Sequence, residues 1–350
     1  MKPIDGAKLL DEVRAALKRY VILPSANAEI AVTLWIVATH AAPGLNTFPR
    51  LAIRSPQKRC GKTRLLDIIG GMCRRPLPTA NISSAVLYRV MGGTDPRTLI
   101  IDEADTIWGT KKQAEQNEDL RGLVNAGFEK GRPTLRYNAA KQVVEELETF
   151  GFVALAGIGA LPDTITDRSV NIVMRRRMNN EKVQPYRSKR DGGQLSGLRD
   201  RVHEWAEALH ADVEKAEPDM PVEDRAADVW ESLIIVADLA GGEWPALARA
   251  AAVDLTNDHE QDDGEASDSL RLMRDIKEVF TEAFMPSKEL VNRLRQIDDA
   301  PWAEYDLSTH KLAERLRHYK IKPGSNGHAR GYKLEDFADT FKRYLTPECQ

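Results

Sequence analysis

The segment that most constrains the fold is Ser55–Thr63, which reads Ser-Pro-Gln-Lys-Arg-Cys-Gly-Lys-Thr. It follows an apolar stretch at Leu51–Arg54 that we expect to be a strand, and it opens a helical pattern at Thr63–Ile69. A turn between a strand and a helix that ends in Gly-Lys-Thr is typical of phosphate-binding loops (P-loops), in which backbone amides and the helix N-terminus face the anion. Strands and helices alternate up to about residue 177, which predicts a three-layer α/β domain with a mainly parallel sheet.

Within this loop, we expect Lys62 to reach the β- and γ-phosphates of ATP and the Thr63 hydroxyl to bind Mg²⁺. Pro56 stands where the motif has its first glycine, and proline removes a donor and fixes φ. The alternative is a Gly-Lys-Thr that falls by chance at a strand–helix turn. The residues predicted to bind the nucleotide are Ser55, Pro56, Lys58, Cys60, Gly61, Lys62, Thr63 and Arg64.

A second motif follows at Leu99–Ile101, an apolar strand that ends in the carboxylates of Asp102 and Glu103. Asp102 is expected to hold the Mg²⁺ shell, and Glu103 to activate water as a general base. A buried strand with acidic residues at its exposed end is the alternative. Because both motifs occur in the expected order and setting, the sequence predicts a P-loop ATPase that hydrolyses ATP.

An arginine, Arg168, stands just before the last predicted strand of the sheet, Val170–Met174. Ring ATPases place an arginine finger at this point, where it stabilises transition-state charge on the nucleotide of the neighbouring subunit. An ion pair of Arg168 with Asp163 or Asp167 is an equal alternative.

Two basic segments are candidates for binding DNA. The first, residues 130–141, is expected to be a β-hairpin that could follow a phosphate backbone, although a solvated basic turn is the alternative. The second lies between Ser308 and Arg343, where nine Lys and Arg residues exceed four Asp and Glu residues. Its pattern of helix, strand, turn, strand and helix suggests a winged-helix-like α+β module, a type that also makes protein contacts. The predicted nucleic-acid contacts are Lys130, Arg132, Arg136, Lys141, Lys311, Arg315 and Arg330.

The composition limits how such contacts can be made. The 350 residues include 50 Lys and Arg against 53 Asp and Glu, so a globally basic nucleic-acid coat is excluded and DNA binding needs local patches. Three cysteines and an amphipathic, charged N-terminal helix without the form of a signal peptide predict a cytoplasmic protein. The longest apolar run, Ile30–Ala42, is too short to cross a bilayer, so no membrane contact is expected.

The pattern along the chain predicts five regions. Residues 1–48 form an N-terminal helical segment, with Ser25 capping its second helix, and residues 49–177 form the ATPase core. Residues 178–253 form a helical lid that begins with a polar loop at 178–196. An acidic linker, 254–269, leads to the winged-helix-like module, 270–350.

Six long motifs together resemble an uncharacterised domain family of phages, plasmids and integrated elements, in which the domain is often fused to primase–polymerase or Toprim-like modules. The motifs are SPQKRCGKTRLLD, TLIIDEADTIW, LRGLVNAGFEKG, ALAGIGALPDTITDRSVNIVMRRR, DRAADVWESLIIVADLAGG and DAPWAEYDLSTHKLAERLRHYKIKP. The family is similar to AAA+ and superfamily-three helicase-type motors. The resemblance implies that a Ser-Pro start to the loop is usual, that Arg168 is a finger acting in trans, that residues 130–141 track DNA, and that Arg225 is a lid arginine sensing the γ-phosphate.

From these observations we expect an ATP-driven DNA motor, a replicative helicase or helicase loader of a phage or mobile element. The resemblance implies a ring homo-oligomer, such as a hexamer, with ATP and Mg²⁺ at each interface and with primase supplied in trans. The alternatives are an ATP-gated DNA-binding or phage-defence switch without unwinding activity, and an ATP-binding scaffold that never hydrolyses. The Asp102–Glu103 pair argues against the scaffold.

Overall fold

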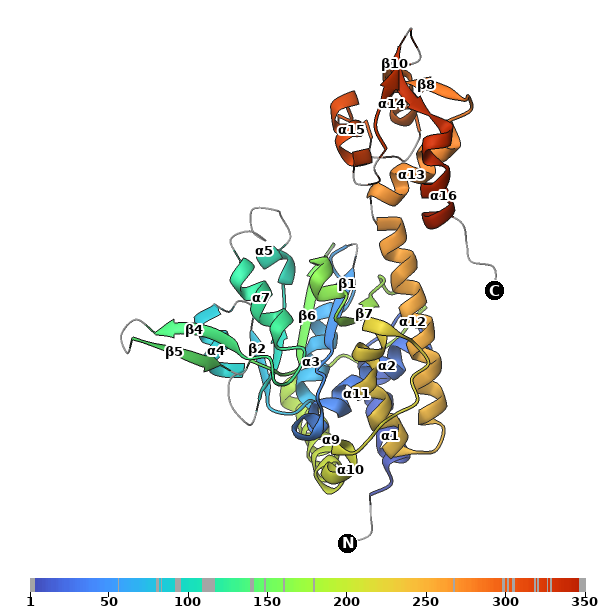
Figure 1. Cartoon of the computed structure of the whole chain (residues 1–350). Helices are drawn as coiled ribbons and strands as arrows, with labels where there is room; N and C mark the ends of the chain where they lie inside the picture. The colour runs from blue at the N-terminus through green and yellow to red at the C-terminus, as the bar shows by residue number, and fades with distance from the viewer. Residues whose placement is uncertain are drawn as a thin grey trace. The chain divides into compact units, whose positions relative to one another are not determined.

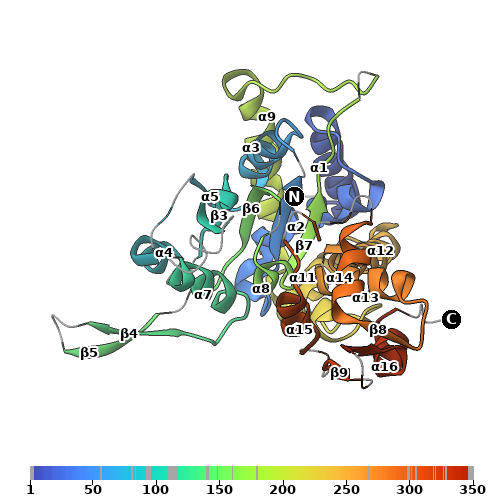
Figure 2. The ribbon, with the colours of Figure 1, turned by 90° about the horizontal axis from the view of Figure 1, so that it is seen from above.

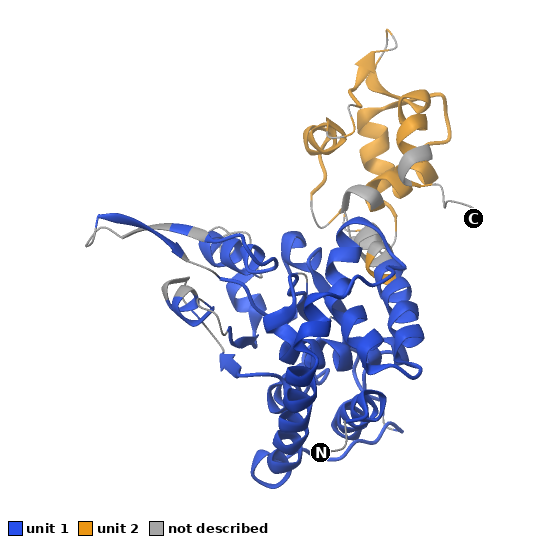
Figure 3. Cartoon of the chain, turned by 60° about the horizontal axis from the view of Figure 1, so that its bottom comes forward, with its two compact units in different colours: residues 1–257 blue, residues 258–350 orange. Residues whose placement is uncertain are grey.

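The computed structural model forms two compact units, residues 1–257 and residues 258–350 (Figure 3). The residues described are 4–55, 57–79, 82, 84–91, 96–108, 117–138, 142–147, 149–159, 161–178, 180–266, 268–297, 300, 302–303, 306–317, 319, 321–325, 327 and 329–345. Among them, no helix has the length and apolar character needed to cross a membrane.

The first unit alternates strands and helices after two N-terminal helices (Figure 1). Its strands are β1 (Arg50–Ser55), β2 (Pro76–Thr79), β3 (Thr98–Ile101), β4 (Thr134–Asn138), β5 (Val143–Leu147), β6 (Val153–Ile158) and β7 (Ser169–Val173). Its helices are α1 (Gly6–Tyr20), α2 (Ala26–Ala41), α3 (Lys62–Met72), α4 (Ser84–Met91), α5 (Ala104–Trp108), α7 (Glu118–Ala126), α8 (Asp163–Thr166), α9 (Ser188–Ala208), α10 (His210–Glu214) and α11 (Asp224–Ala240). A further helix, α12 (Trp244–Ala266), runs past the boundary between the units.

A five-stranded parallel sheet organises the first unit, in the order β2-β3-β6-β1-β7. All four residues of β3 are buried, as expected when both faces of a parallel sheet are covered. The predicted α/β class with a parallel sheet is therefore confirmed. Because the strands are parallel, the residues that follow β1 and β3 emerge at the same edge of the sheet.

Helices cover both faces of this sheet (Figure 2). One hydrophobic cluster joins β1 to α1, α2, α3, α9 and α11, and a second joins β3 to α5 and α7. The predicted cap of α2 is confirmed, since Ser25 Oγ accepts a hydrogen bond from the Ala28 amide at 3.1 Å. The segments expected as N-terminal helices, core and lid thus share one core instead of forming separate domains.

Two helices replace segments expected to be irregular. α9 begins at Ser188, inside the predicted loop 178–196, where Leu195 packs so closely on Gly71 that a Cβ there would lie 2.7 Å from Leu195 Cδ1. The acidic stretch 254–269 is helical except at residue 267, which lies outside the described residues. The boundary between the two units falls within this stretch.

The antiparallel strands β4 and β5 form a hairpin that projects away from the rest of the first unit (Figure 1). The expected hairpin at 130–141 therefore exists, but its strands span 134–147. The second strand brings in Glu145 and Glu146, so the hairpin carries acidic residues as well as basic ones.

The second unit packs helices against a small antiparallel sheet of order β8-β10-β9. Its elements are α13 (Asp268–Val279), β8 (Phe284–Pro286), α14 (Ser287–Arg295), α15 (Thr309–Arg317), β9 (Gly324–Ser325), β10 (Arg330–Lys333) and α16 (Ala338–Tyr344). Its own core includes Trp302, Leu312 and Phe337. Ser308 caps the start of α15, since its Oγ accepts from the Lys311 amide at 3.2 Å.

Candidate functional site

The loop after β1 holds Lys62 at the first position of α3. Gly61 precedes it with φ +86°, a left-handed conformation that favours glycine. Lys62 Nζ donates to Ser55 Oγ at 2.5 Å, and Ser55 Oγ donates to the carbonyl oxygen of Gln57 at 2.7 Å. The ammonium group of Lys62 is thus held at the end of β1 by Ser55, while Pro56 lies outside the described residues.

The other predicted nucleotide contacts have different settings. Lys58 is exposed, whereas the Cys60 thiol is buried and donates to the Gln57 carbonyl oxygen at 3.2 Å. Arg64 lies 3.9 Å from Asp67 and 5.7 Å from the centre of the Tyr186 ring, so it is engaged along the side of α3. Burial raises the pKa of Asp67, Arg64 opposes this shift, and Asp102 adds to it.

The Thr63 hydroxyl meets the second predicted motif directly. Thr63 Oγ1 donates to Asp102 Oδ2 at 2.8 Å, and Asp102 Oδ1 accepts from the amide of Glu103 at 2.9 Å. Glu103 is exposed and has φ +59°, a strained conformation for a residue other than glycine. The turn therefore directs Asp102 toward α3 and leaves the Glu103 carboxylate in solvent.

These groups fit a magnesium ion bound together with phosphates. A threonine hydroxyl and a carboxylate are hard oxygen donors, and Mg²⁺ commonly takes one or two protein ligands while phosphates and waters supply the rest. In the described part of the chain, no three His, Cys, Asp or Glu side chains gather as a metal cluster. By their donor chemistry and their contact at 2.8 Å, Thr63 and Asp102 are the residues that would hold the ion.

Two features beside this pair escaped sequence analysis. Asp105 Oδ1 accepts from the Ile158 amide at 3.0 Å, which ties the start of α5 to the end of β6 and fixes the turn that carries Asp102. A cavity of about 670 Å³ also opens beside Thr63 and Asp102, with Tyr186 among its lining residues. The sequence signals the role of Asp105 only as a further acidic residue after Glu103. Nothing in the sequence signals the cavity.

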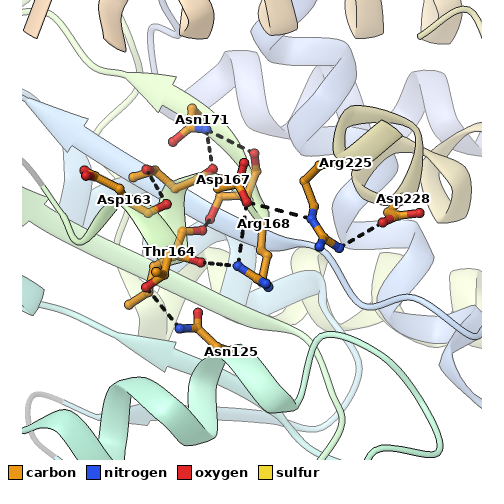
Figure 4. A network of polar contacts seen from close by, with 11 residues as sticks. Asn125, Asp163, Thr164, Asp167, Arg168, Asn171, Arg225 and Asp228 are labelled. Atoms are coloured by element: carbon orange, nitrogen blue, oxygen red, sulfur yellow. Dashed lines mark hydrogen bonds and ion pairs between the residues drawn. The ribbon is translucent and has the colours of Figure 1, made fainter. Parts of the chain in front are cut away.

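Arg168 and Arg225 lie together around Asp167 (Figure 4). Arg168 Nη1 is 3.6 Å from Asp167 Oδ2 and donates to the Thr164 carbonyl oxygen at 3.0 Å. Arg225 Nε is 3.8 Å from the same carboxylate oxygen, and its Nη1 is 2.9 Å from Asp228 Oδ2. The ion pair of Arg168 with Asp167, expected as one alternative, is therefore present.

This arginine pair lies at the opposite edge of the sheet from Lys62. The Arg50 amide, at the start of β1, donates to the Arg168 carbonyl oxygen at 2.9 Å, whereas Lys62 follows the end of that strand. Five residue steps at about 3.3 Å separate the two edges by roughly 16 Å. The strand topology thus places Arg168 and Arg225 away from the loop around Lys62 in the same chain.

Buried Arg50 anchors this second edge. Its guanidinium donates to the carbonyl oxygens of Val124, at 3.0 and 2.6 Å, and of Gly151, at 2.8 Å. Burial lowers the pKa of Arg50 to about 9, and the positive charge of Arg168 adds to this effect. Because the Arg50 amide also bonds the Arg168 carbonyl oxygen, the backbone of Arg168 is held against this anchored residue.

Two of the four predicted DNA contacts at the hairpin, Lys130 and Arg132, have partners within the chain. Arg132 pairs with Glu129 at 2.8 Å, and Lys130 Nζ donates to the Pro43 carbonyl oxygen at 3.4 Å. Arg136 lies opposite Glu145 in the strand register, while Lys141 lies outside the described residues. Of these residues, Arg132 is thus neutralised by an ion pair within the chain.

In the second unit, the predicted basic residues separate into two groups. Lys311 Nζ donates to the Asp306 carbonyl oxygen at 3.1 Å, and Arg315 lies 5.6 Å from the centre of the Trp302 ring. Arg330 instead lines a cavity of about 530 Å³. The other lining residues are Pro286, Ser287, Lys288, Thr309, His310, Ala313, Pro323 and Ala329.

This C-terminal cavity lies at the start of two helices, α14 and α15. Lys288, His310 and Arg330 contribute basic side chains to it, and no Asp or Glu is among its lining residues. The side chain that precedes α14, Pro286, provides no capping hydrogen bond, so the first amides of this helix keep their attraction for anions. The sequence pattern indicates Arg330 but not Lys288 or His310, because only the fold brings the three residues together.

Comparisons with known proteins identify relatives of this chain. Residues 173–344 match the family described as "Protein of unknown function (DUF3631)". An "Uncharacterized 28.9 kDa protein in xis 5'region" of Saccharopolyspora erythraea is 41% identical over 180 residues, which cover 49% of this chain and 68% of that protein. The apo structure of the NrS-1 C-terminal region aligns with 95% of this chain and 76% of that chain, with 13% identity and a TM-score of 0.42, a likeness too distant to bear on function. By its sequence identity, the chain belongs to the family of the Saccharopolyspora erythraea protein.

Proposed function

We propose that this chain is an ATP-hydrolysing DNA motor, a replicative helicase or helicase loader of a phage or mobile element. The observation that carries the proposal is the contact of Thr63 with Asp102 at 2.8 Å, beside Lys62 at the carboxyl edge of a parallel sheet. Open α/β sheets bind ligands at this edge. The setting in a phage or mobile element rests on the family resemblance of the sequence.

In this proposal the loop binds the phosphates of ATP. The amides at the start of α3 and the ammonium group of Lys62 attract the phosphate oxygens, while Thr63 and Asp102 hold Mg²⁺. The ion, when bound, neutralises charge on the β- and γ-phosphates. The Glu103 carboxylate accepts a proton from the attacking water, a role that its exposed position allows.

The position of Arg168 supports a ring of several copies of the chain. Since roughly 16 Å separates the two edges of the sheet, Arg168 can reach a γ-phosphate only on a neighbouring copy of the chain. Asp167 lies between Arg168 and Arg225, so both guanidinium groups are presented on one surface. We therefore assign Arg168 as the arginine finger that acts on a neighbouring subunit. We also propose that Arg225 acts on the neighbouring subunit, beside Arg168, instead of sensing the γ-phosphate in its own chain.

For DNA, the C-terminal cavity has more support than the projecting hairpin. Its basic side chains Lys288, His310 and Arg330 converge on one space beside an uncapped helix start, which suits a backbone phosphate. We take the second unit as a winged-helix-like module because its helices pack with a small three-stranded antiparallel sheet. Primase activity would be supplied in trans.

A switch that binds ATP and DNA without unwinding remains the second candidate. In a single chain, ion pairs with Asp167 hold Arg168 and Arg225. This favours a switch, in which bound nucleotide releases these arginines and so controls whether subunits assemble. Its signature is slow hydrolysis with little stimulation by DNA.

The experiment that separates the two combines three measurements on the full-length chain: oligomeric state by sedimentation, ATPase rate with and without single-stranded DNA, and separation of a forked duplex. The motor predicts a nucleotide-dependent oligomer, stimulation by DNA and strand separation. ATP binding by a monomer, with hydrolysis indifferent to DNA, would contradict the motor and leave the switch.

A further inference from the structure

Three consecutive arginines, residues 175–177, follow β7 and belong to none of the sites described above. Their side chains are exposed, and within the described residues none of them takes part in an ion pair or a hydrogen bond. Glu181, the first acidic residue after them in the sequence, accepts from the Met178 amide at 2.8 Å. The positive charge of the three arginines is therefore not neutralised by an ion pair of the chain's own.

The strand register places these arginines beside the loop that carries Lys62. Val173 pairs with Arg54, and the Met174 amide donates to the Arg54 carbonyl oxygen at 2.7 Å. Met174 also reaches the loop itself, since a Cβ on Gly61 would lie 3.7 Å from Met174 Cε. Because neighbouring strands lie about 4.8 Å apart, the three arginines emerge at the carboxyl edge of the sheet, next to the proposed phosphate site.

Acidic residues surround Arg168 and Arg225 at the opposite edge of the sheet (Figure 4). Asp167 lies 3.6 Å from Arg168 and 3.8 Å from Arg225. Asp228 lies 2.9 Å from Arg225. Asp163, one turn before Asp167, is exposed and has no ion pair in the part of the chain that the structure describes. We call these five residues the finger surface, on which carboxylates outnumber guanidinium groups.

The ion pairs of Asp167 are easily exchanged. Its side chain is 58% exposed, and exposed pairs contribute little to stability, so Arg168 can leave Asp167 at low cost. When Arg168 reaches a phosphate on a neighbouring copy, Asp167 loses that partner close to the neighbour's phosphate loop. Residues 175–177 of the neighbour flank this loop and carry the opposite charge.

We propose that residues 175–177 of one copy of the chain bind the finger surface of the next copy, through the carboxylates of Asp163 and Asp167. The inference rests on the proposed function, because the ring brings the amino edge of one sheet to the carboxyl edge of the next. Such a head-to-tail contact joins two different surfaces, and rings of this kind close by repeating it. Opposite charges across an interface steer the encounter and fix its register. The new ion pairs replace those that Arg168 leaves in its own chain.

Charge reversal tests this contact in the full-length chain, with assembly measured by sedimentation in the presence of a non-hydrolysable ATP analogue. Arg175→Glu with Arg177→Glu should raise the dissociation constant of assembly by at least about tenfold, because like charges then face each other. Asp163→Lys with Asp167→Lys should do the same for the same reason. The matched control, Lys189→Glu with Lys215→Glu, reverses two exposed lysines of other segments and should assemble as the wild type does.

The decisive protein combines both reversals, so that every interface again joins opposite charges. We expect its dissociation constant to return to within about threefold of the wild-type value, as for coupled residues in a double-mutant cycle. Loss of assembly that the combination does not restore would overturn the contact, whether it comes from misfolding or from weaker nucleotide binding.

Two further outcomes separate this contact from the proposed function. A wild type that stays a monomer with the nucleotide analogue would contradict the ring, and this contact with it. A wild type that assembles no better than Arg175→Glu with Arg177→Glu would show that the contact alone is wrong. If that variant assembles normally and instead binds single-stranded DNA more weakly, the arginines serve nucleic acid and the contact is likewise overturned.

Discussion

The hydroxyl of Thr63 lies 2.8 Å from a carboxylate oxygen of Asp102, which joins the helix after β1 to the turn after β3. The sheet order sets these two turns on strands separated only by β6. A hydroxyl and a carboxylate at this distance can hold one divalent ion between them. The proposed hydrolysis of ATP depends on this contact and on Lys62 at the start of α3.

Replacing the proposed base tests the role of Glu103. Glu103→Gln should reduce the turnover of ATP by about 10²- to 10⁴-fold, because the proton acceptor is lost, while ATP affinity remains. Steady-state hydrolysis and equilibrium binding of a fluorescent ATP analogue measure the two effects. Glu118→Gln, at an exposed residue of α7, serves as the control. Normal turnover in Glu103→Gln would remove this residue from the mechanism.

Mixing two inactive proteins tests whether Arg168 acts on a neighbouring subunit. Arg168→Ala and Lys62→Ala should each lose most activity, and an arginine finger contributes about 10³- to 10⁵-fold. In mixed rings, an intact Lys62 of one subunit meets an intact Arg168 of the next, so part of the activity should return. If mixtures stay as inactive as the separate proteins while still assembling, the arrangement in trans is incorrect.

The C-terminal cavity predicts which basic residues bind DNA. The double variant Lys288→Ala, Arg330→Ala should weaken DNA binding by at least about tenfold and lower its salt dependence, because two phosphate contacts are lost. Fluorescence anisotropy in a series of salt concentrations measures both. Arg274→Ala, an exposed arginine of α13 outside the cavity, is the matched control. Equal losses in the control and the double variant would indicate a general charge effect and contradict a defined site.

Buried His40 predicts a dependence of stability on pH. Its pKa is about 3 in the folded chain against an ordinary value of 6.5, so below pH 6.5 the unfolded chain binds a proton that the folded chain does not. The free energy of unfolding should therefore fall as the pH drops from 6.5 toward 3. Between pH 6.5 and 5 this loss is about 2 kcal/mol.

His40→Gln removes the titrating group and keeps a donor for the Met72 carbonyl oxygen. Urea unfolding at pH 6.5 and pH 5 should show a smaller loss of stability in this variant than in the wild type. An equal loss in both proteins would mean that His40 is protonated in the folded state.

Much of the fold follows from local patterns in the sequence. The apolar strand before Asp102, the Gly-Lys-Thr turn before α3 and the Ser25 cap of α2 are set by short stretches of chain, and each appears as expected. The sequence pattern does not indicate strand β2, because Pro76 and Pro78 alternate within it, and proline is tolerated only at the edge of a sheet.

Long-range packing explains what the sequence could not predict. α9 forms although Gly192, Gly193 and Gly197 interrupt it, because Leu195 is buried against Gly71 of α3. The cavities depend on residues far apart in the chain, such as Lys288 with Arg330. The position of Arg225 beside Asp167 likewise follows from the packing of α11, which no local motif encodes.

The rate of Mg²⁺-dependent ATP hydrolysis by the wild-type chain and by Lys62→Ala decides whether this chain has a nucleotide site. We predict hydrolysis that requires Mg²⁺ and falls at least about a hundredfold in the variant, since the loop then lacks the group that binds the β- and γ-phosphates. Equal rates in the two proteins, or no ATP binding by the wild type, would contradict a nucleotide site at Lys62, Thr63 and Asp102.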